Sequence, residues 1–165
     1  MKIGELVEHY NLDRHPEGGW YRRSVTSSCT TETLYGTRPA VTSIYYLLEH
    51  GDSSRPHKVR HDEIWHFLEG DDVIVATAGE DFSNFTETII GGLPMPHRSL
   101  LVPANYWQSA RPLGEYALLA CTVSPGFDFE DFHLPLGEEL ELLLQKCPSF
   151  YPYLQPQCEH LVHAE

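Results

Sequence analysis

The sequence predicts a mainly β protein, either a two-sheet sandwich or a closed barrel, with a short helix near each end. Two observations predict this fold class. Short runs of β-branched, aromatic and aliphatic residues alternate with turn signals from about residue 21 to residue 133. Apolar residues recur at helical spacing only in two stretches, one before this region and one after it. No repeat or linker is present, so residues 1–165 are expected to form a single domain.

The first element is an amphipathic helix over residues 2–10, where apolar side chains recur at helical spacing. The segment HPEGGW, residues 15–20, contains one proline and two glycines, which indicates a turn. Short strands bounded by glycine and proline are expected to follow. They are Tyr21–Ser27, Val41–Glu49, Glu63–Leu68, Asp72–Thr77, Phe85–Ile90, Ser99–Val102 and Tyr116–Val123.

A second helix is expected over about residues 135–146. Pro135 suits its first turn, two glutamates suit the positive end of the helix dipole, and Pro148 prevents further extension. Its apolar stripe consists of Leu136, Leu140, Leu143 and Leu144. The tail from residue 148 to residue 165 contains three prolines and is expected to lie extended over the barrel. The acidic run before the helix, residues 128–131, is expected to form a structural corner with solvated acids rather than a catalytic pair.

The acidic composition of the chain argues against polyanionic binding partners. The chain carries 24 acidic and 11 basic side chains, a net charge of -13, which repels nucleic acid and anionic membranes. A small-molecule ligand that is neutral, cationic or bound to a metal is easier to accommodate. The four cysteines form no CxxC pair, and no signal peptide or membrane-spanning stretch is visible. These features are typical of a cytoplasmic protein with reduced cysteines.

The stretch HKVRHDEIWHFLEG, His57 to Gly70, is dense in histidines and carboxylates, which raises the question of a metal site. Its frame resembles the first motif of the cupins, because Gly51, His57, Glu63 and Gly70 fall at the intervals of that motif. The second cupin motif is matched by Pro103–Gln108, in which Asn105 replaces a turn glycine. Asn tolerates this exchange because it enters the left-handed region more easily than most residues.

Four segments resemble an uncharacterised branch sometimes called cupin family five, over roughly residues 6–135. They are HPEGGWYRRS (15–24), DEIWHFLEG (62–70), VPANYWQSAR (102–111) and CTVSPGFDFEDF (121–132). The resemblance implies a double-stranded β-helix, the jelly-roll cupin barrel, with its core at about residues 21–133. It implies little about activity, because cupins host many unrelated functions.

The motif frame resembles that of cupins with a mononuclear metal site, in which three histidines and one glutamate hold the metal. At those positions this chain keeps His57 and Glu63 but has Val59 and Gln108 in place of two histidines. A glutamine carbonyl is a poor ligand for borderline transition metals. Strand alternation places His66 on the face opposite Glu63, whereas the turn that contains His61 leaves this side chain able to swing inward. We therefore predict no tightly held transition metal, and no cofactor.

The resemblance places His57 and Glu63 inside the barrel as candidate catalytic residues. The predicted pocket consists of His57, Glu63, Trp65, Phe67, Gln108 and Arg22. Simpler interpretations remain open: His57 and Glu63 pair with each other or with Gln108, and Trp65 belongs to the core. Arg22 and Arg23 face opposite sides of one strand, so only one of them can close the pocket over an anionic group.

Three functions stay open. The first is a metal-independent epimerase or isomerase acting on a sugar-like or carbonyl-containing ligand, with His57 as base and Tyr45 or Tyr46 as partner. The second is a non-catalytic ligand-binding module. The third is a metal-dependent dioxygenase or isomerase.

The strand Glu63–Leu68 has no polar face, which bears on assembly. An antiparallel sheet usually leaves one face wet, and two short helices cannot cover a whole sheet. A homodimer is therefore expected, in which outer sheet faces or exchanged N-terminal strands meet across a two-fold axis.

Overall fold

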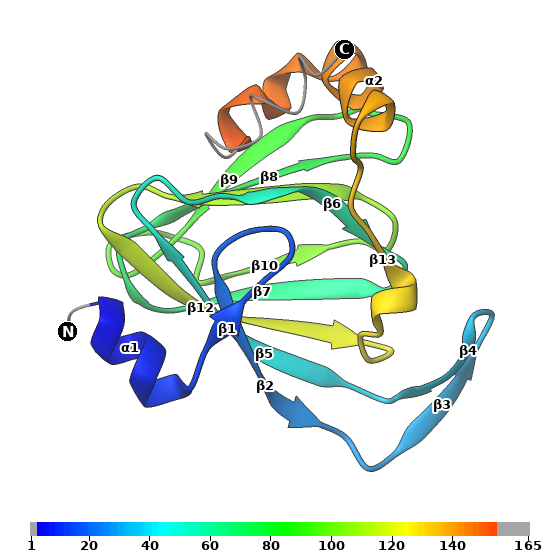
Figure 1. Cartoon of the computed structure of the whole chain (residues 1–165), viewed down its shortest axis with the longest axis horizontal. Coiled ribbons are helices and arrows are strands. Elements are labelled where there is room, and N and C mark those ends of the chain that lie inside the picture. Colours follow the sequence, from blue (N-terminus) through cyan, green and yellow to red (C-terminus); the bar gives the residue numbers. More distant parts are fainter. Residues whose placement is uncertain (1–2, 155–165) are drawn as a thin grey trace.

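Two antiparallel sheets stack face to face in the computed structural model, which describes residues 3–154 (Figure 1). The first sheet runs in the order β1 (Asp13–Arg14), β2 (Trp20–Thr26), β5 (Thr42–Glu49), β12 (Tyr116–Ser124), β7 (Asp62–Gly70) and β10 (Ser99–Val102). The second runs β13 (Phe132–His133), β6 (Ser54–Val59), β11 (Trp107–Pro112), β8 (Val73–Ala78) and β9 (Thr86–Ile90). A separate hairpin, β3 (Thr30–Thr33) and β4 (Gly36–Pro39), projects from the first sheet.

The mainly β prediction is confirmed, and each predicted strand is present with its ends displaced by no more than two residues. The strands that carry His57 and Gln108, β6 and β11, were not among the predicted strands. Their sequences, SRPHKV and WQSARP, contain too few apolar residues to show strand alternation. Both are nevertheless almost fully buried, because β11 pairs on both sides and β6 lies between β11 and β13.

The core lies between the two sheets, as strand alternation predicts. On β7, Glu63, Trp65 and Phe67 are buried, while Ile64 and His66 on the other face are only half-buried. The inward aromatic and aliphatic side chains of both sheets form one continuous cluster. Its largest fully buried members include Trp65, Tyr46, Leu48 and Ile90.

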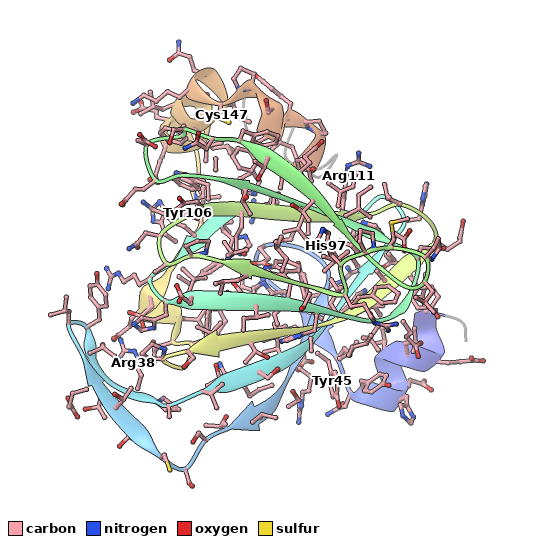
Figure 2. The ribbon with its side chains drawn as sticks, turned by 180° about the vertical axis from the view of Figure 1, so that it is seen from behind. Arg38, Tyr45, His97, Tyr106, Arg111 and Cys147 are labelled. Carbon is pink, nitrogen blue, oxygen red and sulfur yellow. The ribbon has the colours of Figure 1, made fainter. Side chains whose placement is uncertain are left out.

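Each α-helix covers the outer face of one sheet. Helix α1 (Ile3–Tyr10) packs Leu6 against Leu47 and Leu118 of the first sheet. Tyr45 also points outward there, beside α1 in Figure 2, with its ring 4.7 Å from that of Tyr10. Helix α2 (Glu138–Lys146) covers the second sheet with three leucines of the predicted stripe, Leu140, Leu143 and Leu144.

Two expectations at the C-terminal end are wrong. Leu136 precedes α2 and is 57% exposed, so it does not belong to the buried stripe. The tail was expected to be extended, but Pro148–Tyr153 forms a 3-10 helix, η2, that buries Phe150 and Tyr153. These aromatic side chains gain burial against the second sheet by folding back. The remainder of the predicted tail, and Cys158, lie outside the described residues.

The projecting hairpin is tied to the barrel by an ion pair (Figure 2 labels Arg38). Arg38 Nε lies 2.7 Å from Asp131 Oδ2, and Arg38 Nη2 lies 3.2 Å from Asp131 Oδ1. Asp131 is the last residue of the short 3-10 turn η1 (Phe129–Asp131) and is 2% exposed, so the expectation that all acids of this corner stay solvated is wrong. Burial alone would raise the pKa of Asp131, but Arg38 outweighs it and lowers the pKa.

Neither α-helix within residues 3–154 has the length and apolar character needed to cross a bilayer.

Candidate functional site

A cavity lies at one end of the barrel, where β5 and β7 begin and β6 and β12 end. Its roof is the segment from Phe127 to Phe132, and the space inside it that is open to water is about 30 Å³, room for about two water molecules. Its polar lining differs from the predicted set. The ionisable side chains that line it are His15, Glu17, Tyr21, Arg23, His57, Glu63 and Cys121.

The HPEGGW loop brings His15 and Glu17 into the cavity. Gly18 and Gly19 have φ angles of 115° and 70°, which side chains with a Cβ rarely adopt. A Cβ on Gly19 would lie 2.7 Å from the carbonyl oxygen of Leu47, so the loop can pack this closely on β5 only with glycine. Tyr46 faces inward and donates its hydroxyl to the carbonyl oxygen of Gly18, at 2.8 Å.

His57 and Glu17 form a buried pair in which the tautomer of the histidine is determined by its neighbours. His57 Nδ1 lies 2.7 Å from the carbonyl oxygen of Arg55, which can only accept, so this nitrogen carries a proton. His57 Nε2 is then turned toward Glu17 Oε2, at 3.3 Å. Ser54 donates to the other oxygen of Glu17, at 2.9 Å. The pair therefore holds one ring nitrogen and one carboxylate at the cavity wall.

His15 stands beside this pair as a neutral ring. Its Nδ1 accepts the backbone N–H of Glu17, at 3.2 Å, which places the ring proton on Nε2. Burial lowers the pKa of His15, and the nearby His57 acts in the same direction, although Glu17 opposes them. Four aromatic rings, among them Tyr21 and Phe132, surround the imidazole.

Glu63 lies on the other wall, at the end of a hydrogen-bonded chain. The indole N–H of Trp65 donates to Gln108 Oε1, at 2.7 Å, and Gln108 Nε2 donates to Glu63 Oε2, at 2.6 Å. Because an indole can only donate, the orientation of the Gln108 amide is determined by Trp65. His57, Glu63 and Gln108 lie together inside the barrel, and Gln108 is the direct strand neighbour of His57. Gln108 and Trp65, which were predicted to line the pocket, lie behind the cavity instead.

Glu63 is the group best suited to exchange a proton near neutral pH. Burial raises its pKa to about 7, against the lowering effects of His57 and of the Gln108 hydrogen bond. Within residues 3–154, its second oxygen, Oε1, has no hydrogen-bond partner, and Glu63 lines the cavity. Cys121 lines the same wall, and burial raises the pKa of its thiol well above the usual range, so it is held as the neutral thiol.

The donor set does not fit the metal site of the fold. The amide of Gln108 turns its N–H toward Glu63 and its oxygen toward Trp65, so it presents no ligand atom to the cavity. Val59 lines the cavity without a donor. Among residues 3–154 no group of three histidine, cysteine or acidic side chains is arranged to hold a metal ion. We derive no chemistry through a metal.

Several predicted site residues lie elsewhere. Arg22 is outside the cavity and pairs with Asp13 at 3.7 Å; Arg23 lines the cavity in its place. Trp65 and Phe67 are buried in the core beyond the cavity, so of the two interpretations of Trp65 the structure supports core packing. His66 is on the outer face, as expected.

His61 does not swing inward. It is buried beside Asp131, with Nδ1 3.8 Å from Oδ2, and lines a groove under the β3–β4 hairpin rather than the cavity. Sequence reasoning missed His15 and Glu17 as site residues. The available signal was the polar pair HPE followed by two glycines, a loop able to fold inward.

A family model described as Cupin superfamily (DUF985) matches residues 4–135, most of the chain. The chain belongs to the cupin superfamily. The matched span contains the loop with His15 and Glu17, both motif strands and the cavity roof, so every residue lining this cupin's cavity lies within it. No curated protein sequence matches the chain.

Two solved structures match the whole cupin, each with a TM-score of 0.79. A protein from Shewanella oneidensis is 28% identical, with 100% of this chain and 99% of that chain covered. A hypothetical protein from Leishmania major is 23% identical, with 99% and 100% covered. A variant of oxalate decarboxylase from Bacillus subtilis is 15% identical, with a TM-score of 0.59. The match covers 92% of this chain and 37% of that chain. This last likeness shows the shared fold alone.

Proposed function

We propose that this cupin is a metal-independent enzyme that moves a proton on a small carbonyl-containing molecule held in the cavity, as epimerases and isomerases do. The observation that carries the proposal is the placement of two proton-exchanging groups on opposite walls. Glu63 extends from β7 of the first sheet, with a pKa of about 7 and a free oxygen. The His57–Glu17 pair stands on the second sheet and the loop next to it. A group whose pKa lies near the working pH is the most effective general acid or base.

The proton steps balance without any other reactant. Deprotonated Glu63 takes the proton from the carbon beside the carbonyl, so the C–H bond breaks and an O–H bond forms at Oε1. The electron pair left behind forms the C=C bond of an enolate. The His57–Glu17 pair, in its protonated form, delivers a proton to the opposite face of that carbon and a new C–H bond forms. No electron is gained or lost overall, and proton exchange with water restores both groups.

Solvent deuterium exchange tests the proposal. In D2O, the protein is expected to replace the C–H beside the carbonyl of pyruvate, hydroxyacetone or glyceraldehyde by C–D, which proton NMR follows as a loss of signal. Glu63→Gln removes the proton-exchanging oxygen, so the rate should fall by about a hundredfold or more. Glu69→Gln is the matched control, since Glu69 is on the same strand, is absent from the cavity lining and contacts Tyr116. A rate that Glu63→Gln leaves unchanged would contradict the proposal.

A non-catalytic binding module is the second candidate, favoured by one observation. Inside the barrel the polar side chains behind the cavity already satisfy one another, as in the chain Trp65–Gln108–Glu63. Such a network rigidifies a site without requiring chemistry. Native mass spectrometry of the purified protein separates the candidates: a retained small molecule together with no enzyme-dependent exchange of any probe supports the binding module.

A further inference from the structure

Arg23 differs from the other cationic side chains near the cavity. It is exposed, lines the cavity and forms no ion pair with any described carboxylate. Its guanidinium carbon lies 5.8 Å from the centre of the Phe127 ring in the cavity roof. Other cations around the cavity have acidic partners, as the ion pairs of Arg14, Arg22, Arg38, Lys58 and Arg60 show.

The strand geometry directs Arg23 toward the cavity. Tyr21 and Arg23 share one face of β2 by alternation, and Ile44, the pairing partner of Arg23 on β5, lines the cavity as well. The register of this strand pair shifts between Arg23 and Val25. A bulge bends a strand and re-aims side chains, and bulges are common next to binding sites. The side chain is thus positioned at the mouth rather than left on an exposed strand edge.

The unpaired guanidinium of Arg23 can attract an anionic ligand that the rest of the protein repels. The protein carries a net charge of -13, so its overall field repels anions. Two of the acidic side chains, Glu17 and Glu63, line the cavity itself. In a chain with 24 acidic side chains, a cation at the entrance that none of them neutralises leaves its charge available to a ligand. A guanidinium presents paired N–H donors that match the two oxygens of a carboxylate.

We infer that the cavity selects small hydroxy- or oxo-carboxylic acids, with the carboxylate held by Arg23 at the mouth and the hydroxyl or carbonyl end between His57 and Glu63. The inference rests on the proposed function for the role of the inner groups, but its selectivity for the acid rests on Arg23. The space open to water, about 30 Å³, restricts the part of the ligand beyond the mouth to a few atoms.

The two adjacent arginines provide a matched experiment. Dissociation constants of glycolate and of glycolamide, its neutral isostere, are measured by calorimetry on the full chain. Wild type should bind glycolate more tightly than glycolamide. Arg23→Gln should weaken glycolate binding by about tenfold, or about 1.4 kcal/mol, and change glycolamide binding little. Arg23→Lys keeps the charge without the paired donors, so its affinity should lie between these two. Arg22→Gln, on the opposite face of the same strand, should leave both affinities unchanged.

Several results would overturn the inference. They are equal affinity for acid and amide in wild type, no detectable binding of either, an equal loss in Arg22→Gln and Arg23→Gln, or tighter binding of methyl phosphate than of glycolate. The failure of the proposed function is distinguishable. If Arg23→Gln weakens glycolate binding selectively while no probe exchanges deuterium, the site binds carboxylic acids without the chemistry. If hydroxyacetone exchanges as fast as pyruvate, the chemistry stands and the selectivity is wrong.

Discussion

At the scale of single residues, Glu63 links the chemistry of the cavity to the stability of the fold. Burial raises its pKa from 4.5 to about 7. The folded state therefore keeps a proton that the unfolded chain releases between these two pH values. A state that binds more protons loses stability as the pH rises. Below pH 4.5 the ionisation of Glu63 therefore costs the folded state little. Above about pH 7 it lowers the free energy of unfolding by its full amount, about 3 kcal/mol.

Glu63→Gln, which cannot ionise, should remove this dependence. The free energy of unfolding of the variant minus that of wild type is expected to rise by about 3 kcal/mol between about pH 4 and about pH 8. Urea unfolding of both proteins across this range measures the difference, in which the titration of other groups largely cancels. A difference that stays constant with pH would mean that Glu63 is ionised throughout, and would also weaken its proposed role as base.

We expect Trp65 to influence the pKa of Glu63 through the Gln108 amide that lies between them. In Trp65→Phe, Gln108 Oε1 loses its donor at a fully buried position, which should cost about 1–3 kcal/mol besides the lost packing. The freed amide can turn its oxygen toward Glu63, where it favours the protonated acid. We expect the pKa of Glu63 to rise further above 7, as carbon-detected NMR titration of the glutamate carboxyls would measure. Trp20→Phe, whose indole donates to Glu49 outside the cavity, is the control; an unchanged or lower pKa in Trp65→Phe would contradict the mechanism.

The resemblance to the cupin motifs predicted that His57, Glu63 and Gln108 lie inside the barrel, where all three are buried. It could not decide between Arg22 and Arg23. Both sides of the stretch WYRRS carry polar or amphipathic residues, and a strand without an apolar face does not reveal which side points inward. Glu17 was missed for a different reason. Its direction depends on the contact of Gly19 with β5, which is tertiary.

At the scale of elements, the HPEGGW loop is the part that builds the site, and Gly19 is its critical residue. Gly19→Ala would place a Cβ 2.7 Å from Leu47 O and 2.9 Å from Leu48 Cδ2, at a φ of 70°. The positive φ alone costs about 1–2 kcal/mol, and the backbone clash adds to it, so the loop should shift outward with Glu17. Chemical denaturation measures the loss, expected to be about 2 kcal/mol or more.

Gly4→Ala is the matched control for this change. Gly4 lies in helix α1, where an added Cβ meets nothing within 4 Å, so alanine should stabilise by about 0.5–1 kcal/mol through its helix propensity. A loss in Gly19→Ala no larger than a few tenths of a kcal/mol would show that the loop tolerates displacement and that its close packing does not hold the site.

The elements found from the sequence are those whose apolar periodicity is local. The strands of the first sheet and the leucine stripe of α2 show it clearly. The strands β6 and β11 do not, because their buried polar side chains are stabilised by partners far away in the sequence. Ser109 donates to the carbonyl oxygen of Ser54, and Gln108 donates to Glu63. The conformation of residue 105 could be predicted from the residue type alone. Asn105 adopts the expected left-handed conformation, with a φ of 63°.

At the scale of the whole molecule, the outer face of the first sheet is only partly covered. Helix α1 covers the part around Leu47 and Leu118. Toward the β10 edge an apolar surface remains, with Leu68 41% and Leu101 52% exposed. Ile64, the strand partner of Leu101, is half-buried on the same face. Exposed apolar side chains that gather on one face of a sheet favour an interface there.

We expect two copies to meet through this surface in an isologous dimer, since a surface patch that is buried against itself satisfies both copies at once. Sedimentation equilibrium at micromolar concentration should give about twice the chain mass of 18.8 kDa. Leu101→Lys with Leu68→Lys should shift the protein to the monomer, because each would bury a charge against its symmetry mate. Leu34→Lys, at the tip of the β3–β4 hairpin and 97% exposed, should leave the dimer intact. A wild-type mass of 18.8 kDa would mean that the remaining face stays in water, and dissociation by Leu34→Lys alone would place the interface on the hairpin instead.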